Sequence, residues 1–240
     1  MHSFSCIKKG NHKLMKERLR IAIIGIVTIL IMTSTVIVTA RAETPLTPPV
    51  RFDPTEKVTS SEQALQFLQA GNRRFVTGEM LRREDYGYAR LATEDSQYPF
   101  AVILACSDSR VSPEILFDQG IGDIFVIRNA GNIADTTALG SLEYAVEYLG
   151  VSLIVVKGHE HCGAVSGAFS GKHEYPENLK GVLKYIAKNI AGSQSENDAI
   201  LMNIAAVTKQ VKTNSIVQAN HVKVIGAYYD FGTGVVTFIE

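Results

Sequence analysis

Short apolar runs alternate with helical patterns along the middle of the chain. The runs are 100–105 (FAVILA), 124–127 (IFVI) and 151–156 (VSLIVV), and such short, continuous runs are typical of strands buried on both faces of a sheet. Between the last two runs, 136–149 carries apolar residues at the spacing of one helix face. This alternation predicts a single α/β domain with a mostly parallel central β-sheet flanked by helices.

The pattern continues to the end of the chain. Helical spacing covers about 177–190 and 197–217, and two strand-like segments follow near 222–229 and 234–239. These two segments predict a C-terminal strand hairpin. In sheets of this class, ligands bind beyond the carboxyl ends of the parallel strands, so functional side chains are expected there.

A further helix is predicted before the first strand. Thr59-Ser-Ser-Glu62 fits an N-terminal capping box, and Leu65, Leu68 and Phe75 then fall near one helix face. We interpret this helix as an N-terminal arm. Its apolar face suits packing on a partner subunit or on its own domain, and the pattern leaves both open.

The first 42 residues differ from the rest. A charge-free run at 21–40 follows a Lys/Arg-rich lead and precedes Ala40-Arg41-Ala42, which is typical of a secretory signal peptide cleaved before Glu43. A run of this length can also span a bilayer, so a membrane anchor at 21–40 is the alternative. Both interpretations predict export, as a periplasmic or secreted protein or as an anchored one. Residues 43–58 are proline-rich and predict a linker to a domain at 59–240.

The net charge of the chain is unevenly distributed between residues 1–42 and the rest. Seven of the 24 Lys/Arg but one of the 24 Asp/Glu lie in 1–42, so the remainder has 17 basic and 23 acidic residues, a net charge of −6. It has no basic stripe, which argues against a nucleic-acid partner. The hydrophobic content of 46% is sufficient for one buried core.

Two cysteine-containing motifs follow the first and third apolar runs. Cys106-Ser-Asp108-Ser-Arg110 leaves the first, and His159-Glu-His-Cys162 leaves the third. Neighbouring parallel strands end at the same edge of a sheet, so two thiols and one imidazole can converge there. Two cysteines and a histidine with an open fourth position form a known catalytic zinc arrangement. The sequence therefore predicts Cys106, His159 and Cys162 as metal ligands.

Plainer interpretations of these residues stay open. Buried cysteines often act as small apolar side chains, and exported domains favour disulfides, so a Cys106–Cys162 disulfide is an alternative. Asp108 and Arg110 are two positions apart and are compatible with an ordinary surface salt bridge.

Together the motifs resemble the signature of the β-carbonic anhydrases. The resemblance runs from about residue 64 to the C-terminus and includes Arg128-Asn-Ala-Gly-Asn132. It implies reversible hydration of CO₂ to bicarbonate and a proton, with Zn²⁺ as cofactor bound by the two cysteines and the histidine. Zinc lowers the pKa of bound water to about 7, giving the hydroxide that attacks CO₂. The resemblance further implies that Asp108 orients this hydroxide and that Arg110 keeps Asp108 off the metal.

The same resemblance implies a substrate pocket. Gln97 lies where the plant-like branch has a glutamine that hydrogen-bonds the substrate, and Phe125, Ala130 and Tyr144 occupy positions that line the apolar pocket. Ala130 is smaller than the valine often found there. For Phe125 and Tyr144, ordinary core packing is the alternative. The resemblance also implies that this chain forms a homodimer or a larger homo-oligomer, with CO₂ and bicarbonate as its small-molecule partners.

Two other functions remain possible at this stage. One is a related hydrolase on the same scaffold that acts on carbonyl sulfide or carbon disulfide, which are also small, linear and apolar. The other is an exported protein that binds zinc only as a structural element. The presence of Asp108, Arg110 and Gln97 disfavours the second function, because a structural zinc site needs none of them.

Overall fold

The computed structural model describes residues 53–81, 86–171 and 174–240. The predicted signal or anchor at 1–42, and the predicted linker up to residue 52, lie outside these residues. Within the part that is described, none of the helices combines the length and the apolar character needed to cross a membrane.

The centre of the fold is a five-stranded sheet with the order β2-β1-β3-β4-β5. β1 pairs in parallel with β2 and β3, and β3 with β4, whereas β5 is antiparallel to β4. This confirms the predicted mostly parallel sheet with a C-terminal hairpin. The strands are β1 (Ala101–Cys106), β2 (Ile124–Asn129), β3 (Leu153–His159), β4 (Lys223–Tyr229) and β5 (Val236–Ile239).

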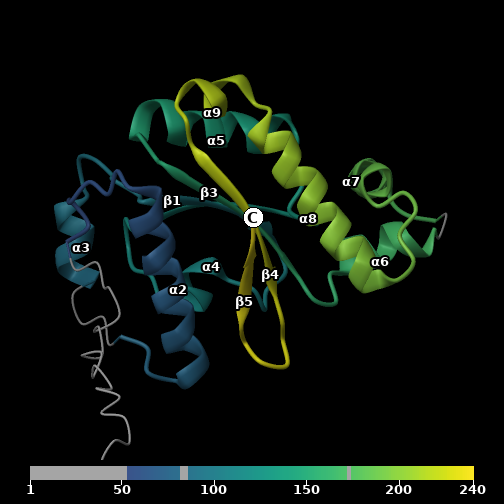
Figure 1. Cartoon of the computed structure of the whole chain (residues 1–240), viewed down its shortest axis with the longest axis horizontal. Coiled ribbons are helices and arrows are strands. Elements are labelled where there is room, and N and C mark those ends of the chain that lie inside the picture. The colour runs from purple at the N-terminus through teal and green to yellow at the C-terminus, as the bar shows by residue number, and fades with distance from the viewer. Residues whose placement is uncertain (1–52, 82–85, 172–173) are drawn as a thin grey trace, which may run out of the picture. The chain divides into compact units, whose positions relative to one another are not determined.

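Helices cover both faces of this sheet. In Figure 1, α5 and α9 lie together at the top of the view, α2 and α4 lie on the left, and α6 and α7 lie on the right. The helices are α2 (Ser61–Thr77), α3 (Tyr86–Ala92), α4 (Pro113–Leu116), α5 (Thr136–Leu149), α6 (Gly163–Ser170), α7 (Glu177–Asn189), α8 (Glu196–Lys212) and α9 (Ser215–Ala219).

Successive residues of β1 face opposite sides of the sheet. Ile103 packs in one core cluster with Leu68 of α2, whereas Val102 and Leu104 pack in a second cluster with Leu142 of α5. All six residues of β1 are buried. A strand covered on both faces needs apolar residues at every position, which explains the continuous apolar run in the sequence.

The register of the central strands determines where their polar ends meet. Ala105 of β1 lies opposite Lys157 of β3. β1 therefore ends at Cys106 beside the point where β3 ends at His159. The two cysteine-containing motifs are thus brought to one edge of the sheet, as predicted.

The N-terminal helix begins one residue later than the capping box indicated. Ser60, not Thr59, is the N-cap, and its side chain accepts a hydrogen bond from the Gln63 backbone N–H. The helix packs on its own domain: the Asn72 side chain is buried and bonds the backbone of the β4–β5 hairpin and of α4. The part of the helix around Asn72 therefore packs on its own domain.

Other differences have local causes. The helical pattern predicted over 197–217 is two helices, because the Asn214 side chain accepts hydrogen bonds from the N–H groups of Ile216 and Val217 and so caps α9 as a new helix. α3 and α6 were not predicted, because each is too short to give a convincing apolar period.

Candidate metal centre

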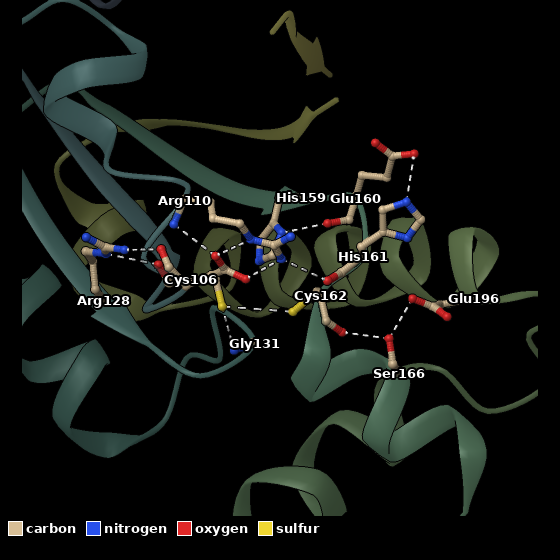
Figure 2. A network of polar contacts seen from close by, with 11 residues as sticks. Cys106, Arg110, Arg128, Gly131, His159, Glu160, His161, Cys162, Ser166 and Glu196 are labelled. Atoms are coloured by element: carbon tan, nitrogen blue, oxygen red, sulfur yellow. Dashed lines mark hydrogen bonds and ion pairs between the residues drawn. The ribbon is translucent and has the colours of Figure 1, made fainter. Parts of the chain in front are cut away.

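Three side chains converge at the carboxyl edge of the central strands. Cys106 is the last residue of β1, His159 is the last residue of β3, and Cys162 is the N-cap of α6. Their sulfur and ring nitrogen atoms all lie within 4.8 Å of one another, and all three residues are buried. Figure 2 shows the Cys106 sulfur directed at that of Cys162, with the His159 ring close by.

The His159 ring has one nitrogen occupied and one without a partner. Its Nδ1 lies 2.7 Å from the Glu160 carbonyl oxygen, which can only accept, so Nδ1 carries the proton. Its Nε2 is buried and has no hydrogen-bond partner in the described part of the chain. A buried nitrogen lone pair without a partner is costly unless it binds something, and a metal ion removes that cost.

The two cysteines are free thiols, so the alternative of a Cys106–Cys162 disulfide is wrong. Their sulfur atoms are 3.9 Å apart. Two sulfur ligands at about 2.3 Å from a tetrahedral zinc ion stand about 3.8 Å apart, which fits this spacing. Their mutual hydrogen bond lowers the pKa of Cys106 and raises the pKa of Cys162. The pair therefore favours one negative charge, and a cation is needed to stabilise the second.

Asp108 and Arg110 form a two-pronged ion pair beside this cluster. The Arg110 Nε donates to Asp108 Oδ1 at 2.9 Å, and Nη2 donates to Oδ2 at 2.7 Å. These bonds hold the pKa of the Asp108 carboxyl well below its usual range. The Asp108 side chain is 17% exposed and that of Arg110 is 52% exposed. The pair is therefore at the rim of the centre and in contact with solvent.

Arg128 and Gly131 belong to the site, although the sequence assigned them no role. Arg128 Nε donates to the Cys106 carbonyl oxygen at 3.0 Å, and Nη2 donates to that of Asp108 at 2.6 Å. The Gly131 N–H donates to Cys106 Sγ at 3.4 Å. Gly131 has φ +75°, and a Cβ there would lie 2.5 Å from Ile186 Cδ1. The sequence could have indicated a role for Arg128, because this residue lies near the carboxyl end of β2, the strand that pairs with β1 beside Cys106.

Three of the four predicted substrate residues lie away from the metal-ligand candidates within one chain. Gln97 and Tyr144 line a pocket of about 570 Å³ whose lining includes none of the three metal-ligand candidates. Phe125 packs against Tyr144 with ring centroids 6.3 Å apart. Phe125 pairs with Val102, four positions before Cys106, which is about 13 Å along the strand. Ala130 directly follows β2 and precedes Gly131, so it is nearer to the centre.

The chain matches the carbonic anhydrase family model over residues 101–236. It belongs to the β-carbonic anhydrase family. Family membership makes the chain a carbonate dehydratase, an enzyme of the lyase class. The matched residues contain both cysteine motifs and the strands β1 to β4, and they end at Val236, the first residue of β5.

Individual relatives agree with this assignment. Carbonic anhydrase from Mycolicibacterium smegmatis is 37% identical over 185 residues, covering 71% of this chain and 89% of the relative. Carbonic anhydrase 2 from Mycobacterium tuberculosis is 48% identical over 112 residues, covering 47% of this chain and 54% of the relative. The solved Coccomyxa β-carbonic anhydrase in complex with acetazolamide is 27% identical with a TM-score of 0.59, covering 69% of this chain and 82% of that one.

Proposed function

We propose that this family member hydrates CO₂ to bicarbonate with one zinc ion held by Cys106, His159 and Cys162. The observation that carries the proposal is the His159 Nε2 atom, which is buried and has no hydrogen-bond partner among the described residues, and whose ring lies with two free sulfur atoms in a cluster of ligand atoms within 4.8 Å of one another. Two thiolates and a neutral imidazole suit zinc and leave a fourth position open. A purely structural zinc site would close with a fourth protein ligand.

The residues around the three ligands have separate tasks. When bound, zinc lowers the pKa of a water molecule to about 7 and so supplies hydroxide near neutral pH. Asp108, ionised because Arg110 holds both its oxygens, accepts the hydrogen bond of the attacking hydroxyl group and directs its lone pair at the CO₂ carbon. Arg128 fixes the backbone of Cys106 and Asp108 by its bonds to both carbonyl oxygens. The proton released in the reaction leaves to solvent.

Metal analysis combined with a CO₂ hydration assay tests the proposal. We expect one zinc per chain in the wild-type protein, and loss of both zinc and activity in Cys106→Ser, His159→Ala and Cys162→Ser. His221→Asn is the matched control, because His221 is exposed and outside the cluster. Full zinc content in Cys162→Ser would contradict the ligand assignment, whereas zinc without hydration activity in the wild type would contradict the function.

We also propose that two copies of the chain are needed for the substrate pocket. Within one chain, Gln97, Phe125 and Tyr144 lie away from the three ligands, so they serve a substrate only if a second copy brings its metal centre to them. The same face exposes Tyr144 and Tyr148, at 47% and 76%. β2 beside it is an edge strand that is only partly buried, which suits an interface between copies.

Complementation tests this arrangement. Gln97→Ala and Cys106→Ser chains are each expected to have low activity, because one lacks the substrate contact and the other lacks a metal ligand. Mixing and refolding the two variants gives hybrid dimers. In each hybrid, the intact metal ligands of the Gln97→Ala chain face the intact Gln97 of the Cys106→Ser chain, so activity should return. If the mixture stays at the sum of its two components, Gln97 does not serve a neighbouring copy.

For the region outside the described residues we propose export, with cleavage after Ala42. This rests on the charge-free run at 21–40 and the Ala40-Arg41-Ala42 sequence behind it. Mass analysis of the protein from a bacterial host should give a mature chain that begins at Glu43. An intact N-terminus in the membrane fraction would support the anchor instead.

A further inference from the structure

The turn between β4 and β5 brings one aromatic ring against two parts of the metal centre. Phe231 meets the His159 ring edge-on, with centroids 5.8 Å apart and an interplanar angle of 81°. The same ring faces Arg110, whose guanidinium carbon is 4.3 Å from the ring centroid. No local sequence pattern indicates this contact, because 121 positions separate Arg110 from Phe231.

The Phe231 ring is held in place by the hairpin that carries it. Its backbone N–H donates to Glu160 Oε2 at 3.1 Å, which connects the turn to the segment between His159 and Cys162. Its ring packs edge-on against Tyr229, with centroids 5.1 Å apart. The hairpin is closed by the Gly234 N–H, which donates to the Asp230 carbonyl oxygen at 3.0 Å. The ring is therefore a fixed surface for whatever packs on it.

The hydrogen bonds of Arg110 do not by themselves fix the plane of its guanidinium group. Its hydrogen bonds to Asp108, and the longer one to the His161 carbonyl oxygen at 3.5 Å, all lie along the edge of the guanidinium. The side chain is 52% exposed, and an exposed ion pair holds its geometry weakly, because solvent screens it and long side chains lose entropy when fixed. A ring face attracts a guanidinium in the direction that edge-on hydrogen bonds leave free.

We infer that Phe231 is a positioning residue for the hydration reaction, acting through Arg110 to keep Asp108 in its hydrogen-bonding orientation. The inference rests on the proposed role of the Asp108–Arg110 pair. The cation–π contact fixes the plane of the guanidinium, and the two-pronged bond transmits that orientation to the carboxylate. The aromatic ring is required at this position, and an aliphatic side chain of similar size does not replace it.

The test uses the zinc-loaded full-length protein and the variant Phe231→Leu. We expect zinc content to stay at the wild-type level and kcat/KM for CO₂ hydration to fall about two- to five-fold, the range of a cation–π contact at an exposed site. Phe231→Tyr retains the ring and should retain activity. The Arg110 Nε–H resonance in a ¹⁵N NMR spectrum should move downfield in Phe231→Leu, because the ring above it is gone, and should stay in place in Phe231→Tyr.

A matched control removes a different ring from the same hairpin. Phe238 on β5 stacks on Phe117, with centroids 6.1 Å apart, and makes none of these contacts at the centre. Phe238→Leu should lower stability at least as much as Phe231→Leu while leaving kcat/KM and the Arg110 resonance unchanged. This comparison separates a positioning role from a general loss of packing.

A double-mutant cycle shows whether Phe231 acts through Arg110. In the Arg110→Ala background, Phe231→Leu should cause no further loss of kcat/KM, because the residue that transmits its effect is already absent. An equal loss in both backgrounds overturns the inference, as does wild-type activity in Phe231→Leu. Loss of zinc from Phe231→Leu also overturns it, since the ring would then act through His159. If Arg110→Ala itself keeps wild-type activity, the proposed role of the pair fails, which is a different outcome.

Discussion

The ammonium group of Lys157 donates a hydrogen bond to the Val111 carbonyl oxygen at 3.2 Å, and both residues are fully buried. Lys157 also lies 5.7 Å from the Tyr229 ring centroid. Burial lowers the pKa of this lysine to about 7. Val111 ends the segment that begins after Cys106 and carries Asp108, so a buried lysine on β3 supports that segment at a cost to stability.

Lys157→Met is expected to raise the free energy of unfolding by about 1–4 kcal/mol near pH 6. The pKa of the lysine is about 7 in the folded protein and 10.5 without burial, so the unfolded chain binds more protons between these values. Wild-type stability therefore rises with pH across that window, whereas methionine has no proton to lose. The advantage of the variant should shrink toward pH 10, as urea unfolding at a series of pH values would show.

Lys188→Met is the control for this measurement, because Lys188 is exposed on α7. It should alter the free energy of unfolding little. If Lys157→Met is less stable than wild type at every pH, the hydrogen bond to Val111 outweighs the cost of burial, and the prediction is wrong.

Arg128→Met should lower CO₂ hydration and zinc affinity by about 10–100-fold, the usual effect of removing a residue that orients metal ligands. Arg128 bonds the carbonyl oxygens of Cys106 and Asp108, and a methionine has no donor for either. Arg128→Lys keeps the charge but not the planar fork, so it should recover only part of the loss. Competition with a zinc chelator and a stopped-flow assay would measure both quantities. Full recovery by lysine would show that charge alone matters.

Asn72→Ala should destabilise the fold by about 3 kcal/mol, because three backbone groups, in two buried bonds and one partly buried bond, lose the side chain that bonds them. Asn72 Nδ2 donates to the carbonyl oxygens of Leu116 and Gly234, and its Oδ1 accepts from the Val236 N–H at 2.8 Å. Urea unfolding measures the change. Asn197→Ala is the control, because exposed Asn197 accepts a single bond from the Tyr228 hydroxyl. Equal losses in the two variants would contradict the prediction.

The sequence predicted best where local pattern and tertiary position agree. β1 and β3 are buried on both faces, so their apolar runs were visible, and the polar residues that end them are Cys106 and His159. Because neighbouring parallel strands end at one edge, convergence with Cys162 followed from the predicted topology alone. The cluster of metal-ligand candidates could therefore be predicted from the sequence.

Contacts that depend on the direction of a side chain, or on a second helix or strand, could not be predicted from the sequence. The ring of Phe231 reaches Arg110 only because the β4–β5 hairpin folds back over the end of β3. Gln97 and Tyr144 are remote from the ligands within one chain, which no spacing in the sequence reveals. The break at Asn214 was missed because the apolar period continues through it, while the side chain caps a new helix.

The variants Arg110→Ala and Asp108→Ala separate catalysis from zinc binding. Arg110→Ala should retain zinc but lose most activity, because the Asp108 carboxylate, freed from both of its bonds, is attracted to the adjacent divalent cation and takes the open fourth position. The pair itself is solvent-exposed, so breaking it costs only about 1 kcal/mol or less, and the attraction of the cation drives the change.

Asp108→Ala should behave differently. The fourth position stays accessible to water, but the attacking hydroxyl group loses the acceptor that orients it, so activity should fall by about 10²-fold or more with zinc retained. Zinc-edge X-ray absorption or crystal structures of the two proteins would show four protein ligands in Arg110→Ala and three plus solvent in Asp108→Ala. The low pKa of Asp108 keeps it ionised throughout the neutral range, so the wild-type activity near pH 7 should not depend on its protonation. Wild-type activity in Arg110→Ala, with solvent on the zinc, would show that the pair does not control access to the metal.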